Sequence, residues 1–446
     1  MARSPTNSVF PTDVQIRDFL VERIDKQHQS VGIVVGIVDS TGRATISYGK
    51  FDAGDNRTVE GDTTFEIGSV TKVFTSLILA DMVQRGEVAL THPVAKYLPA
   101  GMKMPERNGG QITLEDLATH TSGLPRLPSN LSPNDAANPY ADYSVERLYQ
   151  FLSGYQLTRD IGSQYEYSNL GGGLLGHVLA RRAEMDYEKL MRSRICQPLG
   201  MQSTSITLSD DMKARFAVGH DATMQRVPYW DLPTLAGAGA LRSTANDLLT
   251  FVATNLGYVK TPLAPAMAAM LAVRRPTGVP GLEVGLAWHI LTRDGHEIAR
   301  HNGGTGGFRS FIGFERSTGM GVVVLSNAET PAGVDDIGQH LLNANAPLWQ
   351  PPKEHKQMPV DPKVFDGYVG QYQLAANFIL TVTREGAQFF VQATGQPKLE
   401  IFPESERDYF LKAVDAEITF ETDSQGRATG LVLHQNGMNQ QGRRIQ

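Results

Sequence analysis

One short segment of this 446-residue chain reads Glu66-Ile67-Gly68-Ser69-Val70-Thr71-Lys72-Val73-Phe74, with a serine and a lysine three residues apart. We expect it to form the first turn of a helix, where residues three apart share a face and their Cβ atoms lie about 5–6 Å apart. A serine hydroxyl becomes a good nucleophile when a nearby base takes its proton, and a lysine with a destabilised ammonium can be that base. The positive end of the helix also favours an oxyanion beside the serine.

The Ser-x-x-Lys pattern is weak evidence on its own, because the chain contains it a second time as Ser47-Tyr48-Gly49-Lys50. That copy lies at the end of a predicted strand, where successive side chains point to opposite faces and glycine favours a turn. No partner motif accompanies it. We interpret the second copy as structural.

A second candidate segment is Tyr165-Glu166-Tyr167-Ser168-Asn169-Leu170, which holds the one Tyr-x-Asn of the chain and precedes a predicted helix. A tyrosine near a lysine ammonium can carry phenolate character and accept a proton. An asparagine can present its amide to a substrate carbonyl. The alternative is a packing aromatic residue followed by an asparagine that caps the helix.

A third segment, His301-Asn302-Gly303-Gly304-Thr305-Gly306-Gly307-Phe308, follows a predicted strand. Glycines at four of five positions allow the backbone to approach a ligand closely. An N–H group of this segment could pair with that of Ser69 as an oxyanion hole. A flexible hairpin is the alternative for this segment taken alone.

Together the three segments resemble the penicillin-recognising serine hydrolases, in the branch of class C β-lactamases, D-Ala-D-Ala carboxypeptidases, D-aminopeptidases and family VIII carboxylesterases. The resemblance covers about residues 15–345 and keeps the motifs in order. Two further segments are similar to that branch: Leu117-Ala118-Thr119-His120-Thr121-Ser122-Gly123-Leu124 and Gly237-Ala238-Gly239-Ala240-Leu241-Arg242-Ser243-Thr244.

The resemblance implies a role for each motif residue. Ser69 would be the nucleophile that accepts the acyl group, and Lys72 and Tyr167 would share the general base and acid work. Asn169, His301 and Gly303 would bind substrate. The backbone N–H groups of Ser69 and Gly304 would form the oxyanion hole.

One departure from the family pattern concerns His301, which stands where many relatives have the lysine of Lys-Thr-Gly. A lysine is a permanent cation suited to a substrate carboxylate, whereas histidine is mostly neutral near pH 7. The departure argues against an efficient β-lactamase and fits the D-aminopeptidase-like and esterase-like members.

The resemblance and the strand and helix signals together predict an α+β fold. We expect an antiparallel sheet flanked by helices, with an inserted helical domain, followed by a small all-β barrel-like domain. The predicted boundaries are a catalytic domain at residues 1–346 with its helical part at about 90–240, a proline-rich linker at 347–363, and a C-terminal domain at 364–446. That last domain resembles the lipocalin-like domain of some D-peptidases in the family, although its length is short for eight full strands.

Composition excludes several classes of protein. The formal net charge of −6 offers no general attraction to nucleic acid or to an anionic membrane, and no apolar run is long enough to span a bilayer. The single cysteine, Cys196, excludes internal disulfides and thiolate zinc clusters. We expect no metal and no cofactor. The N-terminal residues Met1 to Pro5 lack a signal-peptide core, although a signal removed earlier is left open, as are the compartment and the oligomeric state.

Three functions stay open from the sequence. The first is a metal-free serine hydrolase that works through an acyl-enzyme on short peptides or amides with D-residues. The second is a carboxylesterase of the same family with at most weak β-lactamase activity. The third is a non-catalytic sensor, similar to a penicillin-binding protein, that traps its ligand. In each case the partner is a small molecule: a short peptide, an amide or an ester.

Overall fold

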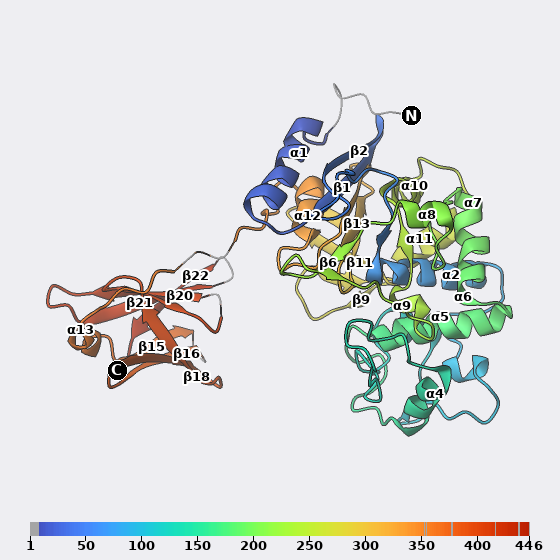
Figure 1. The fold of residues 1–446 in the computed structure, drawn as a ribbon. Helices are drawn as coiled ribbons and strands as arrows, with labels where there is room; N and C mark the ends of the chain where they lie inside the picture. Colours follow the sequence, from blue (N-terminus) through green and yellow to red (C-terminus); the bar gives the residue numbers. More distant parts are fainter. Residues whose placement is uncertain are drawn as a thin grey trace. The chain divides into compact units, whose positions relative to one another are not determined.

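A computed structural model describes residues 9–351, 353, 355–375, 378–414, 416–435 and 438–445 of the chain. It divides into two compact units, Met1–Trp349 and Gln350–Gln446 (Figure 1). Residues Met1 to Pro5, on which the signal-peptide expectation rested, lie outside the described residues. No helix of the described part is both long enough and apolar enough to cross a membrane.

The first unit is built on an eight-stranded antiparallel sheet with the strand order β2-β1-β14-β13-β12-β11-β10-β9. Its central strands are runs of β-branched and other apolar residues, which suit a sheet covered on both faces. The antiparallel sheet expected from the sequence is therefore confirmed. The strands are β1 (Gly32–Asp39), β2 (Gly42–Gly49), β9 (Arg275–Pro276), β10 (Leu282–Val284), β11 (His289–Arg293), β12 (His296–Gly304), β13 (Arg309–Glu315) and β14 (Met320–Ser326).

Both faces of this sheet are covered by helices, as the alternation of side chains along β1 shows. Ile33, Val35 and Ile37 pack in one core with α1 and α12, whereas Val34 and Val38 pack in a second core with α2 and α10. Successive strand residues point to opposite faces, so one strand serves both cores. The helices are α1 (Asp13–Val21), α2 (Thr71–Gln84), α10 (Ala245–Asn255) and α12 (Asp335–Leu342).

The helical part inserted after α2 begins its helices at residues that cap them. Thr113, Ser144, Ser168 and Asp186 each accept a hydrogen bond from a backbone N–H of the first turn. Such caps satisfy N–H groups that have no partner within the helix. The helices of this part are α3 (Leu114–Ala118), α4 (Val145–Gly154), α5 (Asn169–Ala183), α6 (Tyr187–Met191), α7 (Gln197–Leu199), α8 (Asp210–Ala214) and α9 (Ala236–Gly239).

The run Leu282–Ile290 is rich in strand-forming residues, but it does not form one continuous strand. The chain forms β10 and β11 as a hairpin in which Val284 pairs with His289. Between them Ala287 has a left-handed backbone (φ +66°), and a Cβ on Gly285 would lie 2.5 Å from the carbonyl oxygen of Met270. Met270 lies in helix α11 (Ala264–Ala272), which the sequence did not predict. Because its backbone comes so close to Gly285, the turn falls at this glycine, within the apolar run.

The second unit is a closed antiparallel barrel of eight strands in chain order, β15 to β22. The segment is short for eight full strands but forms eight, because the polar segment Met438–Arg444 closes the barrel between β21 and β15. Aromatic side chains fill the interior, and Phe365 of the short helix α13 (Pro362–Asp366) stacks on Phe389 at 3.9 Å. The strands are β15 (Gly370–Ala375), β16 (Phe378–Glu385), β17 (Gln388–Ala393), β18 (Lys398–Pro403), β19 (Asp408–Leu411), β20 (Ala416–Thr422), β21 (Ala428–Gln435) and β22 (Met438–Arg444).

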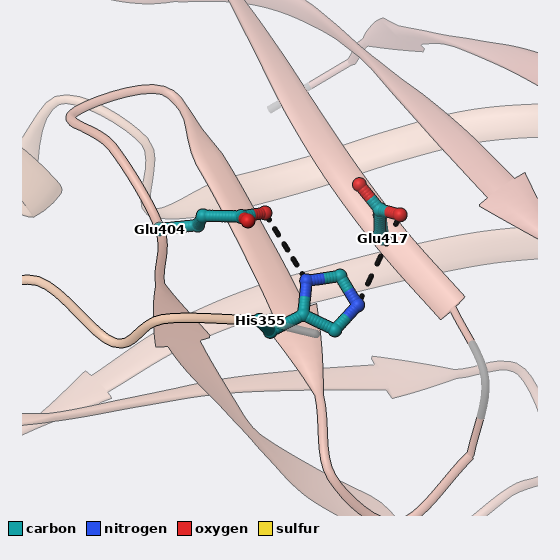
Figure 2. Close-up of side chains that lie close together, drawn as sticks. All are labelled: His355, Glu404 and Glu417. Atoms are coloured by element: carbon teal, nitrogen blue, oxygen red, sulfur yellow. Dashed lines mark hydrogen bonds and ion pairs between the residues drawn. The ribbon is translucent and has the colours of Figure 1, made fainter. Parts of the chain in front are cut away.

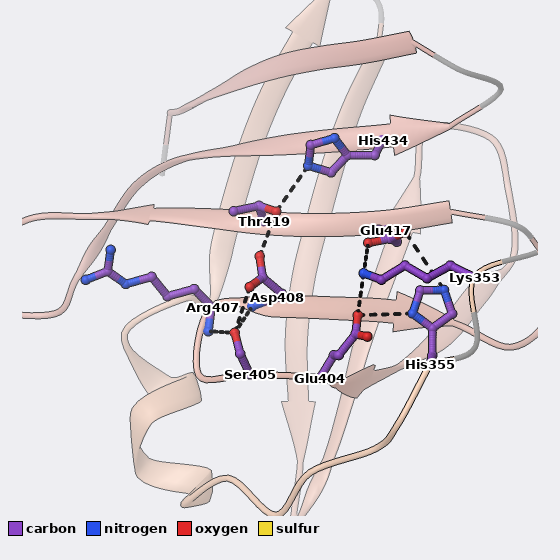
Figure 3. Close-up of polar contacts among 9 residues, drawn as sticks. All are labelled: Lys353, His355, Glu404, Ser405, Arg407, Asp408, Glu417, Thr419 and His434. Atoms are coloured by element: carbon purple, nitrogen blue, oxygen red, sulfur yellow. Dashed lines mark hydrogen bonds and ion pairs between the residues drawn. The ribbon is translucent and has the colours of Figure 1, made fainter.

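Part of the predicted linker at 347–363 is attached to the barrel. The Met358 N–H donates to the carbonyl of Pro403 at 2.8 Å. Lys353 donates to Glu404 and Glu417 at 2.9 and 3.0 Å (Figure 3). These contacts fasten the second half of the proline-rich segment to the C-terminal unit.

Candidate active site

Ser69 and Lys72 lie together at the start of α2. Ser69 lies in a 3₁₀ turn, Gly68–Val70, that leads directly into the α-helix beginning at Thr71. The Lys72 Nζ atom donates to the Ser69 Oγ at 3.0 Å, to the Asn169 Oδ1 at 2.8 Å and to the carbonyl of Ala238 at 2.7 Å. Three acceptors fix the position of the amine, and the Lys72 side chain is only 2% exposed.

The turn before α2 is pressed against the end of β12. Gly68 has φ +48°, and a Cβ there would lie 2.7 Å from the amide nitrogen of Gly304. A Cβ on Gly303 would lie 2.1 Å from the carbonyl oxygen of Ile67, which also accepts a bond from the Ser310 hydroxyl at 2.8 Å. The glycines therefore allow two backbone segments to touch beside Ser69, as close approach requires.

Tyr167 and Asn169 reach the same place from the start of α5. Asn169 is the first residue of that helix, and its amide oxygen accepts a bond from Lys72. The Tyr167 ring centre is 4.9 Å from the Lys72 Nζ, and the phenol contacts the Ser69 hydroxyl. The structure thus brings together the three motifs that are far apart in the sequence.

The pKa values of Lys72 and Tyr167 are shifted in opposite directions. Burial lowers the pKa of Lys72 well below its usual value, and the positive charge of Arg126 lowers it further. Burial also raises the pKa of Tyr167, although its contact with Ser69 acts in the other direction. Burial therefore disfavours the charged form of both groups. In its neutral form the Lys72 amine, 3.0 Å from the Ser69 Oγ, would accept the hydroxyl proton of the serine instead of donating to it.

The histidine of the third motif lies behind the site. The His301 side chain is 1% exposed, its Nδ1 donates to the Asn302 carbonyl at 2.7 Å, and its Nε2 has no hydrogen-bond partner. Burial lowers the pKa of His301 well below its usual value. The nearby His289, whose ring centre is 5.2 Å away, is the histidine that lines the cavity.

A cavity of about 570 Å³ opens beside Ser69. Its polar lining comes from several segments that sequence reasoning missed, because they share no motif or spacing. His289 follows the turn between β10 and β11, and its Nε2 lies 2.8 Å from the Tyr165 hydroxyl. The lining residues that the sequence did not single out include Arg126, Tyr140, Trp230, His289, Arg309 and Glu329.

The second Ser-x-x-Lys copy lies outside this cavity. Ser47 is part of the outermost strand β2, where its carbonyl accepts a bond from Arg17, and Lys50 is exposed just beyond the strand. The structural interpretation of this copy agrees with its place at the sheet edge.

A group of metal-ligand type lies in the C-terminal unit, formed by His355, Glu404 and Glu417 (Figure 2). The two carboxylates face different ring nitrogens, at 3.1 Å from Nδ1 and 3.9 Å from Nε2. The Lys353 ammonium bonds to both carboxylates (Figure 3). An imidazole offers one nitrogen to one ion, so we interpret this group as an ion-pair network that holds the linker.

Comparison with known proteins places the first unit in a family. The family model described as Beta-lactamase matches residues 18–345, and the model described as Domain of unknown function (DUF3471) matches residues 354–445. The description of the DUF3471 model does not mention lipocalins. The resemblance of the barrel to a lipocalin-like domain therefore stays a prediction.

Individual relatives agree with the family model. The chain is 30% identical to the D-alanyl-D-alanine-carboxypeptidase/endopeptidase AmpH of Escherichia coli (strain K12), over 78% of this chain and 93% of that protein. It is 24% identical to penicillin-binding protein 4* of Bacillus subtilis (strain 168), over 94% of this chain and 96% of that protein.

Solved structures show the same fold. A class C beta lactamase from Rhodobacter sphaeroides is 27% identical and superposes with a TM-score of 0.64, over 74% of this chain and 99% of that one. The family model covers most of the chain. Residues of all three sequence motifs within that range line one cavity. The chain therefore belongs to the Beta-lactamase family and is a serine hydrolase with a beta-lactamase/transpeptidase-like fold.

Proposed function

We propose that this hydrolase works through an acyl-enzyme on Ser69 and cleaves short peptides or amides that contain D-residues. The observation that carries the proposal is the hydrogen bond of 3.0 Å between the Lys72 amine and the Ser69 hydroxyl, in a setting that disfavours the ammonium. The name of the Escherichia coli relative, a D-alanyl-D-alanine carboxypeptidase and endopeptidase, supports the choice of substrate.

In the proposed acylation step, Ser69 Oγ forms a bond to the substrate carbonyl carbon while its proton passes to Lys72 Nζ. The carbonyl oxygen becomes an oxyanion that the N–H groups of Ser69 and Gly304 stabilise. Collapse of this intermediate breaks the C–N bond, and the leaving nitrogen takes a proton from the Tyr167 phenol, which Lys72 then reprotonates. A phenol with a raised pKa holds its proton at neutral pH, so it serves this step as an acid.

The acyl-enzyme is then hydrolysed by water. The water oxygen attacks the ester carbon and gives its proton to the neutral Lys72 amine, and the Ser69 oxygen leaves and recovers a proton from the same group. The Asn169 amide oxygen accepts a bond from Lys72, and one amide N–H donates to the Tyr140 hydroxyl at 3.5 Å. The second N–H of this amide is the group that we assign to the acyl side of the substrate.

An ester substrate is the second candidate, and one observation favours it. Two histidines near the site, His289 and His301, are neutral at pH 7, because burial lowers the pKa of His289 to about 4 and that of His301 well below its usual value. Neutral groups on β11 and β12 suit uncharged substrates such as simple esters.

A hydrolysis panel tests these functions. It contains a peptide ending in D-Ala-D-Ala, D- and L-aminoacyl p-nitroanilides, p-nitrophenyl esters and a chromogenic cephalosporin, with Ser69→Ala as the control. Release of D-alanine or of p-nitroaniline from the D-series supports the peptidase. Ester turnover without any peptide or amide turnover supports the esterase. Stoichiometric acylation of Ser69 with no turnover of any member supports the sensor and contradicts the proposal.

A further inference from the structure

We propose that Arg126 binds the free C-terminal carboxylate of the substrate and so directs the enzyme to peptides whose leaving group is an anionic amino acid. The inference deepens the proposed function and rests on it. It assigns a specificity-determining role to a residue outside the three sequence motifs.

The backbone holds Arg126 beside the catalytic groups. Its carbonyl accepts hydrogen bonds from the N–H groups of Asn169 and Leu170 at 2.9 and 3.1 Å, and the preceding carbonyl, of Pro125, accepts from the Ser168 hydroxyl at 2.7 Å. The loop before Arg126 is thereby tied to the first turn of α5. These bonds use main-chain atoms of Arg126, so a change of its side chain leaves them intact.

The Arg126 guanidinium points into the cavity and is available to a ligand. It lines the cavity beside Ser69, and its central carbon lies 5.3 Å from the centre of the Tyr167 ring. Among the residues that the structure describes, no carboxylate lies within ion-pairing distance of it. The other arginine of the cavity, Arg309, differs in this respect, because it makes two parallel bonds to Glu329 at 2.9 and 2.7 Å.

Apart from Arg309, which is paired with Glu329, no other described residue that lines the cavity carries a fixed positive charge. The Lys72 amine is already bonded to Ser69, Asn169 and Ala238. His289 bonds to the Tyr165 hydroxyl, and the His301 side chain is buried behind it. A guanidinium is always charged and presents a fork of donors that matches a carboxylate.

The reaction geometry places a substrate carboxylate near Arg126. In a peptide with a free C-terminus, the nitrogen of the scissile bond and the terminal carboxylate carbon are separated by a single Cα atom. The proposed proton donor to that nitrogen is Tyr167. The Arg126 guanidinium, which lies over the Tyr167 ring, is therefore on the leaving-group side of the site. There it would bind a free C-terminal carboxylate but not a C-terminus that is blocked as an amide.

The test compares a peptide ending in D-Ala-D-Ala with the same peptide ending in the C-terminal amide. The ratio of their kcat/KM values is measured for the wild type, Arg126→Gln and Arg126→Lys. Arg107→Gln is the matched control, because Arg107 lies outside the cavity, pairs with Asp160 and carries the same charge. A ratio cancels effects on folding or on the chemistry that both substrates share.

We expect Arg126→Gln to lower the acid-to-amide ratio by about 10- to 100-fold, as loss of a charged hydrogen bond does. Arg126→Lys should keep part of the preference for the acid, since lysine keeps the positive charge but not the paired N–H donors of the guanidinium. Arg107→Gln should keep the whole preference. An unchanged ratio in Arg126→Gln, or a wild type that prefers the amide, would overturn the assignment while leaving the peptidase intact.

If the wild type cleaves neither peptide, the proposed function fails, and a second measurement decides the role of Arg126. The peptide acid and the peptide amide are then compared as ligands, through their affinities for the wild type and for Arg126→Gln measured by calorimetry. Tighter binding of the acid to the wild type, with that preference lost in Arg126→Gln, supports the assignment. The same affinity ratio in both proteins overturns it.

Discussion

A Cβ atom on Gly172 would lie 2.9 Å from Cε and 3.2 Å from Cδ of Lys72. Gly172 is in the first turn of α5, and the backbone of that turn forms the wall against which the lysine chain rests. The glycine run after the Tyr-x-Asn motif therefore has a packing role: it lets α5 approach α2 closely enough for Asn169 to bond to the Lys72 amine.

The first prediction concerns this contact. Gly172→Ala should displace the Lys72 chain and lower kcat by about tenfold or more, because an overpacked contact costs about 1–3 kcal/mol and the amine leaves its position beside Ser69. The measurement is kcat on the best substrate of the panel, with the circular dichroism spectrum as a check of folding. Gly154→Ala is the control, since a Cβ there meets no atom within 4 Å. Full activity of Gly172→Ala would contradict the prediction, because it would show that turnover does not depend on the present position of the Lys72 amine.

The second prediction concerns stability and pH. Burial lowers the pKa of His289 from 6.5 in the unfolded chain to about 4 in the folded one. Between these values the unfolded state binds more protons, so the free energy of unfolding should fall as the pH drops from 6.5 to 4. The shift corresponds to about 3 kcal/mol at most, and solvent screening reduces it because His289 is half-buried.

Denaturant unfolding at several pH values measures this slope in the wild type and in His289→Asn. We expect a shallower dependence on pH in the variant, because it removes the titrating group. His340→Asn is a suitable control, as His340 lies in α12 on the opposite side of the sheet and has its own bond to the Ala346 carbonyl. Equal slopes in the wild type and His289→Asn would contradict the prediction.

The third prediction concerns the acid limb of the pH–rate profile. Arg126 lowers the pKa of Lys72, so removing its charge should raise that pKa. The general base is active when neutral, and the acid limb of kcat/KM for an uncharged ester should therefore move to higher pH in Arg126→Gln. Low ionic strength should make the shift easiest to measure, because Arg126 is exposed and salt screens its charge. A shift to lower pH, or none at low salt, would contradict this account of the Lys72 environment.

Much of the fold could be predicted because its signals are local. The β-branched runs of β1 and β14 and the caps of α3, α4 and α10 are marked by residues next to them in the sequence. The motifs of the candidate site could be found for the same reason, since the Ser-x-x-Lys spacing is a property of one helix turn. The second Ser-x-x-Lys copy, at Ser47, could be interpreted as structural because it lies in a strand.

The parts that escaped prediction depend on distant partners. Strand β22 has a polar sequence, and its place is set by pairing with β21 and β15, as in the pair Leu433 and Gln440. Arg126 comes from a loop and His289 from the start of β11, and neither shares a spacing with Ser69. Their place in the cavity follows from hydrogen bonds of the folded chain, such as that from Asn169 to the Arg126 carbonyl.

The fourth prediction concerns the nucleophile, which is the central claim. A serine-directed fluorophosphonate is incubated with the wild type and with Ser69→Ala, and the labelled peptide is identified by mass spectrometry. We expect one phosphonyl group on Ser69 of the wild type, and neither label nor turnover in the variant. Labelling of another serine, with activity retained in Ser69→Ala, would contradict it.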